Sequence, residues 1–225
     1  MKGRTHRRPR VRSLALLHTA ASHAPRFSAL LESLEEGRGV DVQHVVEETL
    51  LTDARNLGVD DVRVQRRLEQ VLTSLAETSA VILCTCSTLG AAAEAFDKTF
   101  GARILRIDRP LARAAVAQGS TIVVVAALAS TLEPTQALLK DEAARAGKPI
   151  TLTTVVCEGV WDHFERGDKD AYLRAVAAHV DEVQAQGEVV VLAQASMLGA
   201  EAWVKTAKPV LSSPRLGLLA ALELL

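Results

Sequence analysis

The chain alternates short apolar runs, rich in β-branched residues, with longer stretches in which apolar residues recur at helical spacing. Short apolar runs separated by helical stretches are typical of the buried strands of a parallel sheet. The pattern predicts eight strands, over Ser13–His18, Val40–Val46, Ala80–Cys86, Ala102–Ile107, Thr121–Ala127, Ile150–Val156, Val189–Ala193 and Pro209–Leu211.

Stretches rich in Ala, Leu, Glu and Arg lie between these runs and predict helices, among them Val62–Ala76, Thr135–Ala146 and Lys169–Gln184. Pro110, Pro134 and Pro214 stand where helices would begin, and Gly147 stands where one would end. Strands that are apolar on both faces and alternate with helices predict an α/β fold with parallel sheets covered on both sides.

An internal repeat divides the chain into two similar halves. Three sequence matches recur in the same order about 108 to 110 positions apart: Ser22 with Ala29–Leu31 and Ser130 with Ala137–Leu139, Val45–Glu48 and Val155–Glu158, and Val81–Gly90 and Val191–Gly199. Each half would therefore carry four strand–helix units in the same order.

Eight such units fit two architectures: a pair of pseudo-symmetric, doubly wound parallel-sheet lobes with a cleft between them, or a closed (βα)8 barrel, for which ~250 residues are typical. In the two-lobed arrangement we expect a disordered basic tail over residues 1–12. Residues 13–102 plus 208–225 would form the first lobe and residues 103–207 the second. In either architecture the functional residues belong at the carboxyl ends of the strands.

Composition excludes several classes of protein. The 26 Lys and Arg residues nearly cancel the 27 Asp and Glu residues, so no overall field attracts nucleic acid or a membrane surface. The basic start, MKGRTHRRPRVR, is interpreted as a frayed tail rather than a nucleic-acid arm. No apolar stretch approaches the ~20 residues of a membrane span. We therefore expect neither nucleic acid nor a membrane as a partner.

The basic start precedes Leu14–Leu17, which raises the question of a secretory signal. His18 interrupts that short apolar run, and the same segment serves well as a first strand, so we reject the signal. Cys84, Cys86 and Cys157 form an odd set without metal-ligand spacing. A reducing cytoplasm fits such a set best, and no metal site is expected.

Cys86 is the strongest candidate for a reactive group. The sequence contains no phosphate-binding glycine motif and no HExxH or GxSxG motif, so the chemistry must come from side chains at strand ends. Cys86 closes an apolar strand, and Ser87 and Thr88 after it would begin a helix. A helix N-terminus favours the thiolate, which predicts a lowered pKa for Cys86. Its backbone N–H groups also suit a carboxylate.

Two segments resemble motifs of the aspartate/glutamate/hydantoin racemase superfamily. Val81–Leu89, with Cys-Ser-Thr after an apolar strand, resembles the first cysteine motif, and Val191–Met197 resembles the second. The order of the motifs and their spacing of about half the chain also match. The resemblance runs from Leu14 to Pro214 and implies the two-lobed architecture, with a substrate carboxylate held between the lobes.

The resemblance also implies an activity. Members of the superfamily use two cysteines on opposite faces of a Cα–H carbon, one removing the proton and the other returning it, without a cofactor. Here Gln194, or Ala195 if the repeat is aligned one residue later, occupies the position of the second cysteine. An amide does not exchange protons near neutral pH, so the chain is a variant without the second thiol.

The remaining site residues are carried over from the resemblance or taken from strand ends. Ser87, Thr88, Ala195 and Ser196 are expected to hold the substrate carboxylate together with Gln194. Thr131 is a candidate hydroxyl donor, and His18, at the end of the first strand, is a candidate second proton carrier. The resemblance implies a small carboxylate or amino-acid substrate and a homodimer.

Three functions stay open on the sequence. The first is an isomerase or racemase acting at the Cα of an amino acid or related carboxylate. The second is a one-cysteine decarboxylase or lyase on the same scaffold, and the third is a catalytically silent carboxylate-binding protein.

Overall fold

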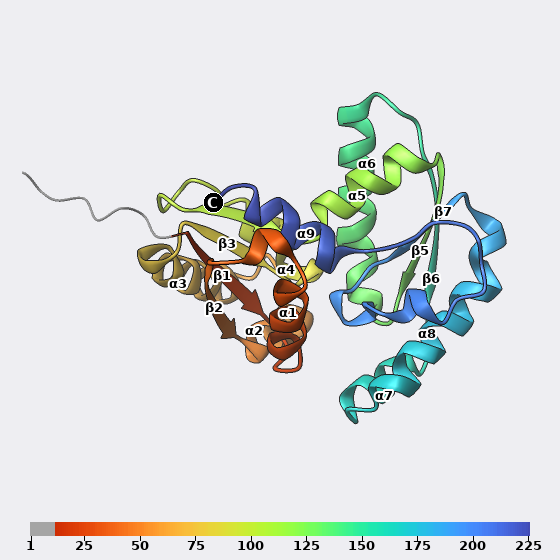
Figure 1. Cartoon of the computed structure of the whole chain (residues 1–225), viewed down its shortest axis with the longest axis horizontal. Coiled ribbons are helices and arrows are strands. Elements are labelled where there is room, and N and C mark those ends of the chain that lie inside the picture. Colours follow the sequence, from red (N-terminus) through yellow and green to blue (C-terminus); the bar gives the residue numbers. More distant parts are fainter. Residues whose placement is uncertain (1–11) are drawn as a thin grey trace, which may run out of the picture.

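The computed structural model describes residues 12–225 and contains two four-stranded parallel sheets (Figure 1). The first sheet has the order β2-β1-β3-β4 and the second the order β6-β5-β7-β8. The strands are β1 (Ser13–His18), β2 (Asp41–Val46), β3 (Val81–Cys84), β4 (Arg103–Arg106), β5 (Thr121–Ala126), β6 (Thr151–Val156), β7 (Val189–Leu192) and β8 (Val210–Ser212). All eight predicted strands are present, with ends within two residues of those expected.

The described part of the chain has nine α-helices, eight of them between strands and α9 after the last strand: α1 (His23–Glu32), α2 (Glu48–Leu57), α3 (Val62–Thr78), α4 (Ser87–Glu94), α5 (Arg109–Gln118), α6 (Leu132–Ala146), α7 (Val160–Glu165), α8 (Lys169–Val183) and α9 (Ser213–Leu222). Pro110 and Pro214 lie in the first turns of α5 and α9. Gly147 ends α6 in the left-handed conformation, with φ of 62°, which glycine adopts without strain.

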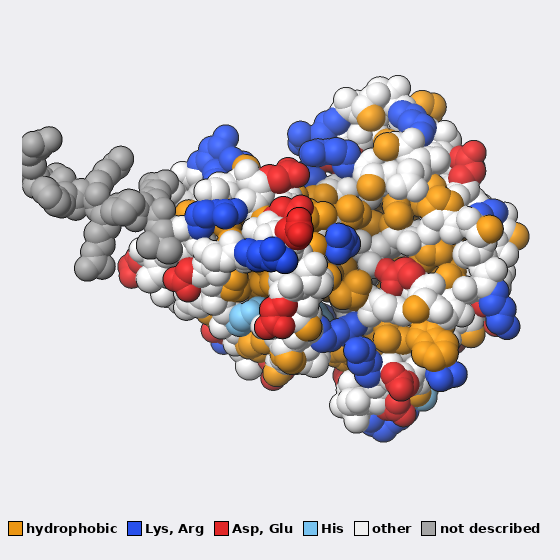
Figure 2. Space-filling model, in the orientation of Figure 1, with side chains coloured by type: hydrophobic (Ala, Val, Ile, Leu, Met, Phe, Trp, Pro, Cys, Tyr) orange, Lys and Arg blue, Asp and Glu red, His pale blue; other side chains and the backbone are white. Residues whose placement is uncertain are grey.

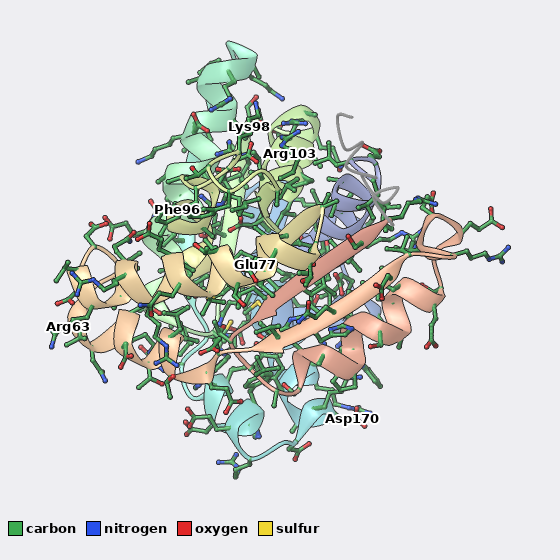
Figure 3. All side chains as sticks on the ribbon, turned by 90° about the vertical axis from the view of Figure 1, so that its left-hand side faces the viewer. Arg63, Glu77, Phe96, Lys98, Arg103 and Asp170 are labelled. Carbon is green, nitrogen blue, oxygen red and sulfur yellow. The ribbon has the colours of Figure 1, made fainter. Side chains whose placement is uncertain are left out.

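Both faces of each sheet are buried, which is why the central strands read as continuous apolar runs. In the first lobe, Ala15 and Leu17 pack with α3 and α4, whereas Leu14 and Leu16 pack with α1 and α9. Figure 3 shows α3 lying along the sheet between the labelled Arg63 and Glu77. In the second lobe, α8 covers one face and α5 and α6 cover the other.

The repeat seen in the sequence is a repeat of structure. The two sheets have the same strand order, and Leu14 pairs with Val81 as Ile122 pairs with Val189, 108 positions later. The two-lobed α/β prediction is confirmed. The barrel alternative is wrong, because the strands of the described chain pair as two separate open sheets.

Strand pairing divides the lobes differently from the expected boundaries at two points. β4, which begins at Arg103, pairs with β3 and completes the first sheet, although residues 103–207 were expected in the second lobe. β8, within residues 208–225, pairs with β7 in the second sheet. Only α9 returns to the first lobe, because Leu218, Ala221 and Leu222 are buried against β1 and β3 (Figure 1).

The expected basic tail over residues 1–12 lies outside the described residues except for Arg12. Within residues 12–225, no helix is long and apolar enough to cross a membrane. Acidic and basic side chains are interspersed on the face drawn in Figure 2, in keeping with the nearly balanced charge of the sequence.

Candidate active site

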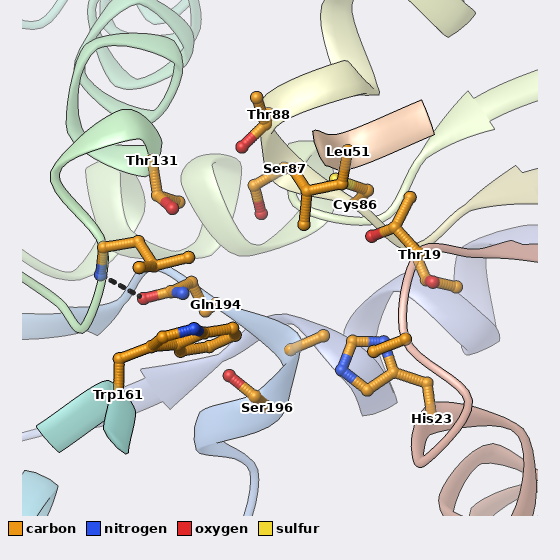
Figure 4. A pocket seen from close by; sticks show the side chains of 14 residues that line it. Thr19, His23, Leu51, Cys86, Ser87, Thr88, Thr131, Trp161, Gln194 and Ser196 are labelled. Carbon is orange, nitrogen blue, oxygen red and sulfur yellow. Dashed lines mark hydrogen bonds between the residues drawn. The ribbon is translucent and has the colours of Figure 1, made fainter. Parts of the chain in front are cut away.

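A small cavity lies where the carboxyl ends of the strands of the two sheets meet (Figure 4). Its volume is about 60 Å³, and because a water molecule needs roughly 10–15 Å³ on this scale, it has room for a few waters or one small ligand group. Seven of the eight candidate residues from the sequence line it: Cys86, Ser87, Thr88, Thr131, Gln194, Ala195 and Ser196. The fold therefore brings the two motif segments together at one site.

Cys86 lies immediately before the first residue of α4 and is 7% exposed. Burial raises the pKa of its thiol, while hydrogen bonds from the Thr19 hydroxyl and from the backbone N–H groups of Leu89 and Thr88 act in the opposite direction. The expected lowering of the Cys86 pKa is therefore wrong, because desolvation outweighs the helix N-terminus. The same three donors still provide a site that stabilises sulfur once it carries charge.

The other two thiols lie away from the cavity. Cys84 is fully buried on β3, and burial raises the pKa of its thiol strongly. Cys157 is 1% exposed, and burial raises the pKa of its thiol to about 12. Cys86 is thus the cysteine of the described chain that reaches the cavity.

Gln194 occupies the position in the second lobe that Cys86 occupies in the first. Both residues have extended backbone, and each immediately precedes a helical segment, α4 after Cys86 and a 3-10 turn (Ala195–Met197) after Gln194. The two positions are 108 residues apart, as the paired strands are, so Gln194 rather than Ala195 is the counterpart of Cys86. The Gln194 side chain is held by its oxygen, which accepts hydrogen bonds from the N–H groups of Ala127 (2.6 Å) and Leu128 (3.2 Å). Figure 4 draws the bond from Leu128.

Further pairs of cavity residues follow the same pseudo-symmetry. His23 and Thr131, which are 108 positions apart, both line the cavity, as do Leu51 and Trp161 at the offset of 110 that relates β2 to β6. Trp161 stacks on Phe164 with ring centroids 4.4 Å apart. The sequence signal that could have linked Trp161 to the site is its place in the repeat, 110 positions after Leu51.

His18 does not line the cavity. It is fully buried, and its ring nitrogens lie 2.9 Å from the Thr85 hydroxyl and 2.9 Å from Nδ1 of His44. Burial, together with the neighbouring His23 and His44, lowers the pKa of His18 to about 3. His18 therefore sits in a hydrogen-bonded pair of histidines under α1, whose Phe27 ring lies 5.2 Å away, rather than facing a ligand.

His23, the first residue of α1, lines the cavity instead. It is 8% exposed, and neither of its ring nitrogens has a hydrogen-bond partner. Burial, and to a lesser degree the charge of Arg26, lowers its pKa to about 4. A buried polar group left without a partner costs about 1–3 kcal/mol, so this arrangement calls for an explanation. The sequence signal for His23 was its place in the repeat, opposite Thr131.

Hydrogen bonds join the two lobes around the cavity. The Ser87 hydroxyl donates to the carbonyl of Ala193 at 3.0 Å, and the Arg26 guanidinium donates to the carbonyls of Ser196 at 2.9 Å and Leu198 at 2.6 Å. Within the second lobe, the Ser196 hydroxyl lies 2.8 Å from the Tyr172 hydroxyl of α8. The contacts between the lobes fix the second motif segment against α1 and α4.

The cavity wall carries neutral polar groups and apolar side chains. No Asp, Glu, Lys or Arg lines it, and among residues 12–225 no three His, Cys, Asp or Glu side chains converge as a metal site would require. Leu51, Leu128 and Trp161 supply its apolar part. The site can therefore bind a small carboxylate through neutral donors and expose it to one thiol and one imidazole.

No protein-family model and no curated protein matches the sequence. Solved structures do match. A glutamate racemase isoform from Bacillus anthracis is 12% identical with a TM-score of 0.70, covering 94% of this chain and 80% of that one. The chain has the fold of the Asp/Glu racemases. An allantoin racemase from Pseudomonas fluorescens is 15% identical with a TM-score of 0.67, covering 94% of this chain and 89% of that one. Unliganded arylmalonate decarboxylase is 15% identical with a TM-score of 0.58, covering 94% of this chain and 91% of that one.

Proposed function

We propose that this chain is a cofactor-independent isomerase or racemase of the Asp/Glu racemase superfamily that acts at the Cα of an amino acid or related small carboxylate. Cys86 is its acid/base group. The observation that carries the proposal is the position of Cys86, a thiol at the start of α4 that lines a cavity between two lobes of this fold. Ser87, Thr88, Thr131 and Gln194 are among the neutral polar residues of the same wall.

The substrate carboxylate is bound by neutral donors in this proposal. The oxygen of Gln194 is engaged with backbone N–H groups, which leaves its NH₂ group as a donor. The hydroxyls of Thr88 and Thr131 add two more groups on the wall. Donors already in place stabilise the enediolate-like charge that develops when the Cα proton leaves, because they need not reorganise.

Cys86 transfers the proton. Burial raises the pKa of Cys86 and so favours the thiol form, which can protonate a carbanion formed at Cα. As a thiolate it can remove the Cα proton, and the Thr19 hydroxyl and two backbone N–H groups then stabilise its charge. One positioned acid/base group of this kind is typically worth ~10²–10⁴-fold in rate.

A one-cysteine decarboxylase is the second candidate. Gln194 stands where the superfamily places its second thiol, and decarboxylation needs only one group to protonate the carbanion left by CO₂. The apolar wall of Leu51, Leu128 and Trp161 would favour loss of a carboxylate charge. Arylmalonate decarboxylase is among the proteins that share this fold.

Deuterium exchange separates the candidates. We expect the protein in D₂O to incorporate deuterium at Cα of at least one member of a panel of amino acids and hydantoins, with optical rotation followed alongside. Cys86→Ser should lower that rate by ~10²–10⁴-fold, whereas the matched control Cys157→Ser, a buried thiol outside the cavity, should keep it. CO₂ release from malonate-type substrates without racemisation would favour the decarboxylase. Absence of both activities would leave only the silent carboxylate-binding protein.

The proposal extends to the protein's setting. The superfamily resemblance favours a homodimer, which sedimentation equilibrium would test. Three cysteines that are all free in the fold are in keeping with a reducing cytoplasm.

A further inference from the structure

The imidazole of His23 is a buried polar group that the protein itself leaves without a partner. Both ring nitrogens lack a hydrogen bond, although the residue is 8% exposed and lines the cavity that holds Cys86. Buried polar groups in proteins are nearly always paired. The partner of His23 is therefore to be sought in what enters the cavity.

The neighbours of His23 explain why no side chain pairs with it. The rings of His18, Phe27 and Phe164 lie around it, with centroids 6.1, 6.1 and 6.3 Å away. His18 uses both of its nitrogens on Thr85 and His44. The charge of Arg26, one turn further along α1, is engaged with the carbonyls of Ser196 and Leu198. No acidic side chain lines the cavity, so no charged group on its wall pairs with the ring, which is neutral at neutral pH because burial lowers its pKa to about 4.

His23 and Cys86 approach the cavity from different sides. Figure 4 shows Cys86 and Ser87 along one side, and His23 and Ser196 along the other. His23 comes from the first turn of α1 and Cys86 from the turn that precedes α4. A substrate carbon held between them would present one face to the thiol and the other to the imidazole.

We infer that His23 is the second proton carrier of the site, in place of the thiol that Gln194 replaces. The inference rests on the proposed function of Cys86. For one enantiomer, a ring nitrogen of His23 takes the Cα proton and its bonding pair becomes the enediolate, which then takes the thiol proton of Cys86 on the opposite face. Inversion leaves imidazolium and thiolate. The other enantiomer reacts from that state, with Cys86 taking the proton and His23 returning one, so no co-reactant is needed.

The two carriers give a stereochemical signature that tests the inference. Each enantiomer of a substrate identified among the amino acids and hydantoins is incubated in D₂O with the wild type, with His23→Asn, and with His44→Asn as the matched control. His44 is a half-buried histidine that does not line the cavity. NMR follows loss of the Cα proton, and optical rotation follows inversion.

We expect His23→Asn to lose inversion by at least 100-fold at every pH. The enantiomer whose Cα–H faces Cys86 should still exchange its proton with retention, at a rate that rises with pH as solvent takes the thiol proton and forms the thiolate base. His44→Asn should invert at the wild-type rate. Equal inversion by wild type and His23→Asn overturns the inference and leaves the proposed function standing. Loss of both inversion and exchange in a His23→Asn protein whose circular dichroism and melting temperature match the wild type also overturns it, because His23 then only binds or orients the substrate. A wild type that exchanges no Cα proton overturns the proposed function, and this inference with it.

Discussion

Cys86 differs from the other two cysteines in what its sulfur contacts. It lines the cavity at 7% exposure and receives hydrogen bonds from the Thr19 hydroxyl and two backbone N–H groups. Cys84 donates its thiol proton to the carbonyl of Cys86, at a sulfur–oxygen distance of 3.7 Å, and Cys157 is buried among apolar side chains. The thiolate is the reactive form of cysteine, so access and these donors decide the order of reactivity.

We predict that iodoacetamide at pH 8 alkylates Cys86 at least ten times faster than Cys84 or Cys157, with peptide mass spectrometry as the measurement. The reason is that Cys86 alone combines access to the cavity with donors to the sulfur. Thr19→Val, which removes one donor, should slow the reaction, and Cys157→Ser should leave it unchanged. Equal and slow labelling of all three thiols would contradict an acid/base role for Cys86.

In the proposed function, Gln194 stands in place of the second thiol of a two-thiol site. We predict that Gln194→Cys gains or increases racemisation, by up to the ~10²–10⁴-fold that one positioned acid/base group typically provides. The measurement is optical rotation with a substrate found by Cα exchange. The substitution also removes the acceptor for the N–H groups of Ala127 and Leu128. Gln194→Ala makes the same loss without adding a thiol and is the matched control. Equal effects of the two substitutions would show that position 194 does not reach Cα.

The residues of the site were predictable where a strand end decides their position. Cys86, Gln194 and their neighbours follow buried strands, and the fold brings them together. His18 also ends a strand, yet it follows Leu14 and Leu16 on the face of β1 that packs on α1. Alternation along the strand therefore turns its ring under the helix. His23 reaches the cavity because it is the first residue of α1, and nothing in the local sequence fixes the direction in which its ring points. Only its repeat partner, Thr131, pointed to it.

At the scale of elements, α9 depends on a close approach that only glycine allows. α9 follows β8 of the second sheet and packs on the first lobe beside α1. A Cβ on Gly217 would lie 2.6 Å from the carbonyl oxygen of Ile107 and 2.4 Å from its Cγ1. Backbone cannot move aside as a flexible side chain can, so any larger residue must push α9 off the first lobe.

We predict that Gly217→Ala lowers the free energy of unfolding by about 1–3 kcal/mol, the usual cost of overpacking. Urea unfolding followed by circular dichroism is the measurement. Arg215→Ala, at an exposed position on the same helix, serves as the control and should change stability by less than about 0.5 kcal/mol. Unchanged stability of Gly217→Ala would mean that α9 packs less closely on Ile107.

The strands themselves were predictable, whereas their grouping into sheets was not. Periodicity located all eight strands, most clearly the buried central strands β1, β3, β5 and β7. The side chains of β4 alternate between half-buried and buried, and β8 is three residues long and half-buried. The sequences of these short strands do not indicate which sheet each strand joins. Membership in a sheet depends on pairing across the fold, which placed β4 in the first lobe and β8 in the second.

At the scale of the whole molecule, the site is also a junction between the lobes. Arg26 of α1 donates to two carbonyls about 170 positions away in sequence, and Ser87 of α4 donates to Ala193 after β7. The buried histidines lie beside this junction, where charging them is costly. The pKa values of His18, at about 3, and His23, at about 4, are lowered from the ordinary 6.5, chiefly by burial, and that of His44 is lowered in the same direction.

These lowered pKa values fix the sign of a pH effect on stability. Below pH 6.5 the unfolded chain binds protons that the folded protein excludes, so we predict that stability is fully present above pH 6.5 and falls as the pH drops toward 4. Each buried histidine contributes up to about 1.4 kcal/mol per pH unit in this window. The carboxyl groups of Asp97 and Asp141 have lowered pKa values and titrate below this pH window.

Urea unfolding of the wild type at pH 7, 5.5 and 4.5 measures the slope of the free energy of unfolding against pH. His23→Asn should reduce that slope, because it removes one of the groups that must stay neutral, whereas His179→Asn, at a side chain that is 30% exposed, should not. A wild type equally stable at pH 7 and 4.5 would show that these imidazoles accept protons in the folded state, and that the junction between the lobes is open to water.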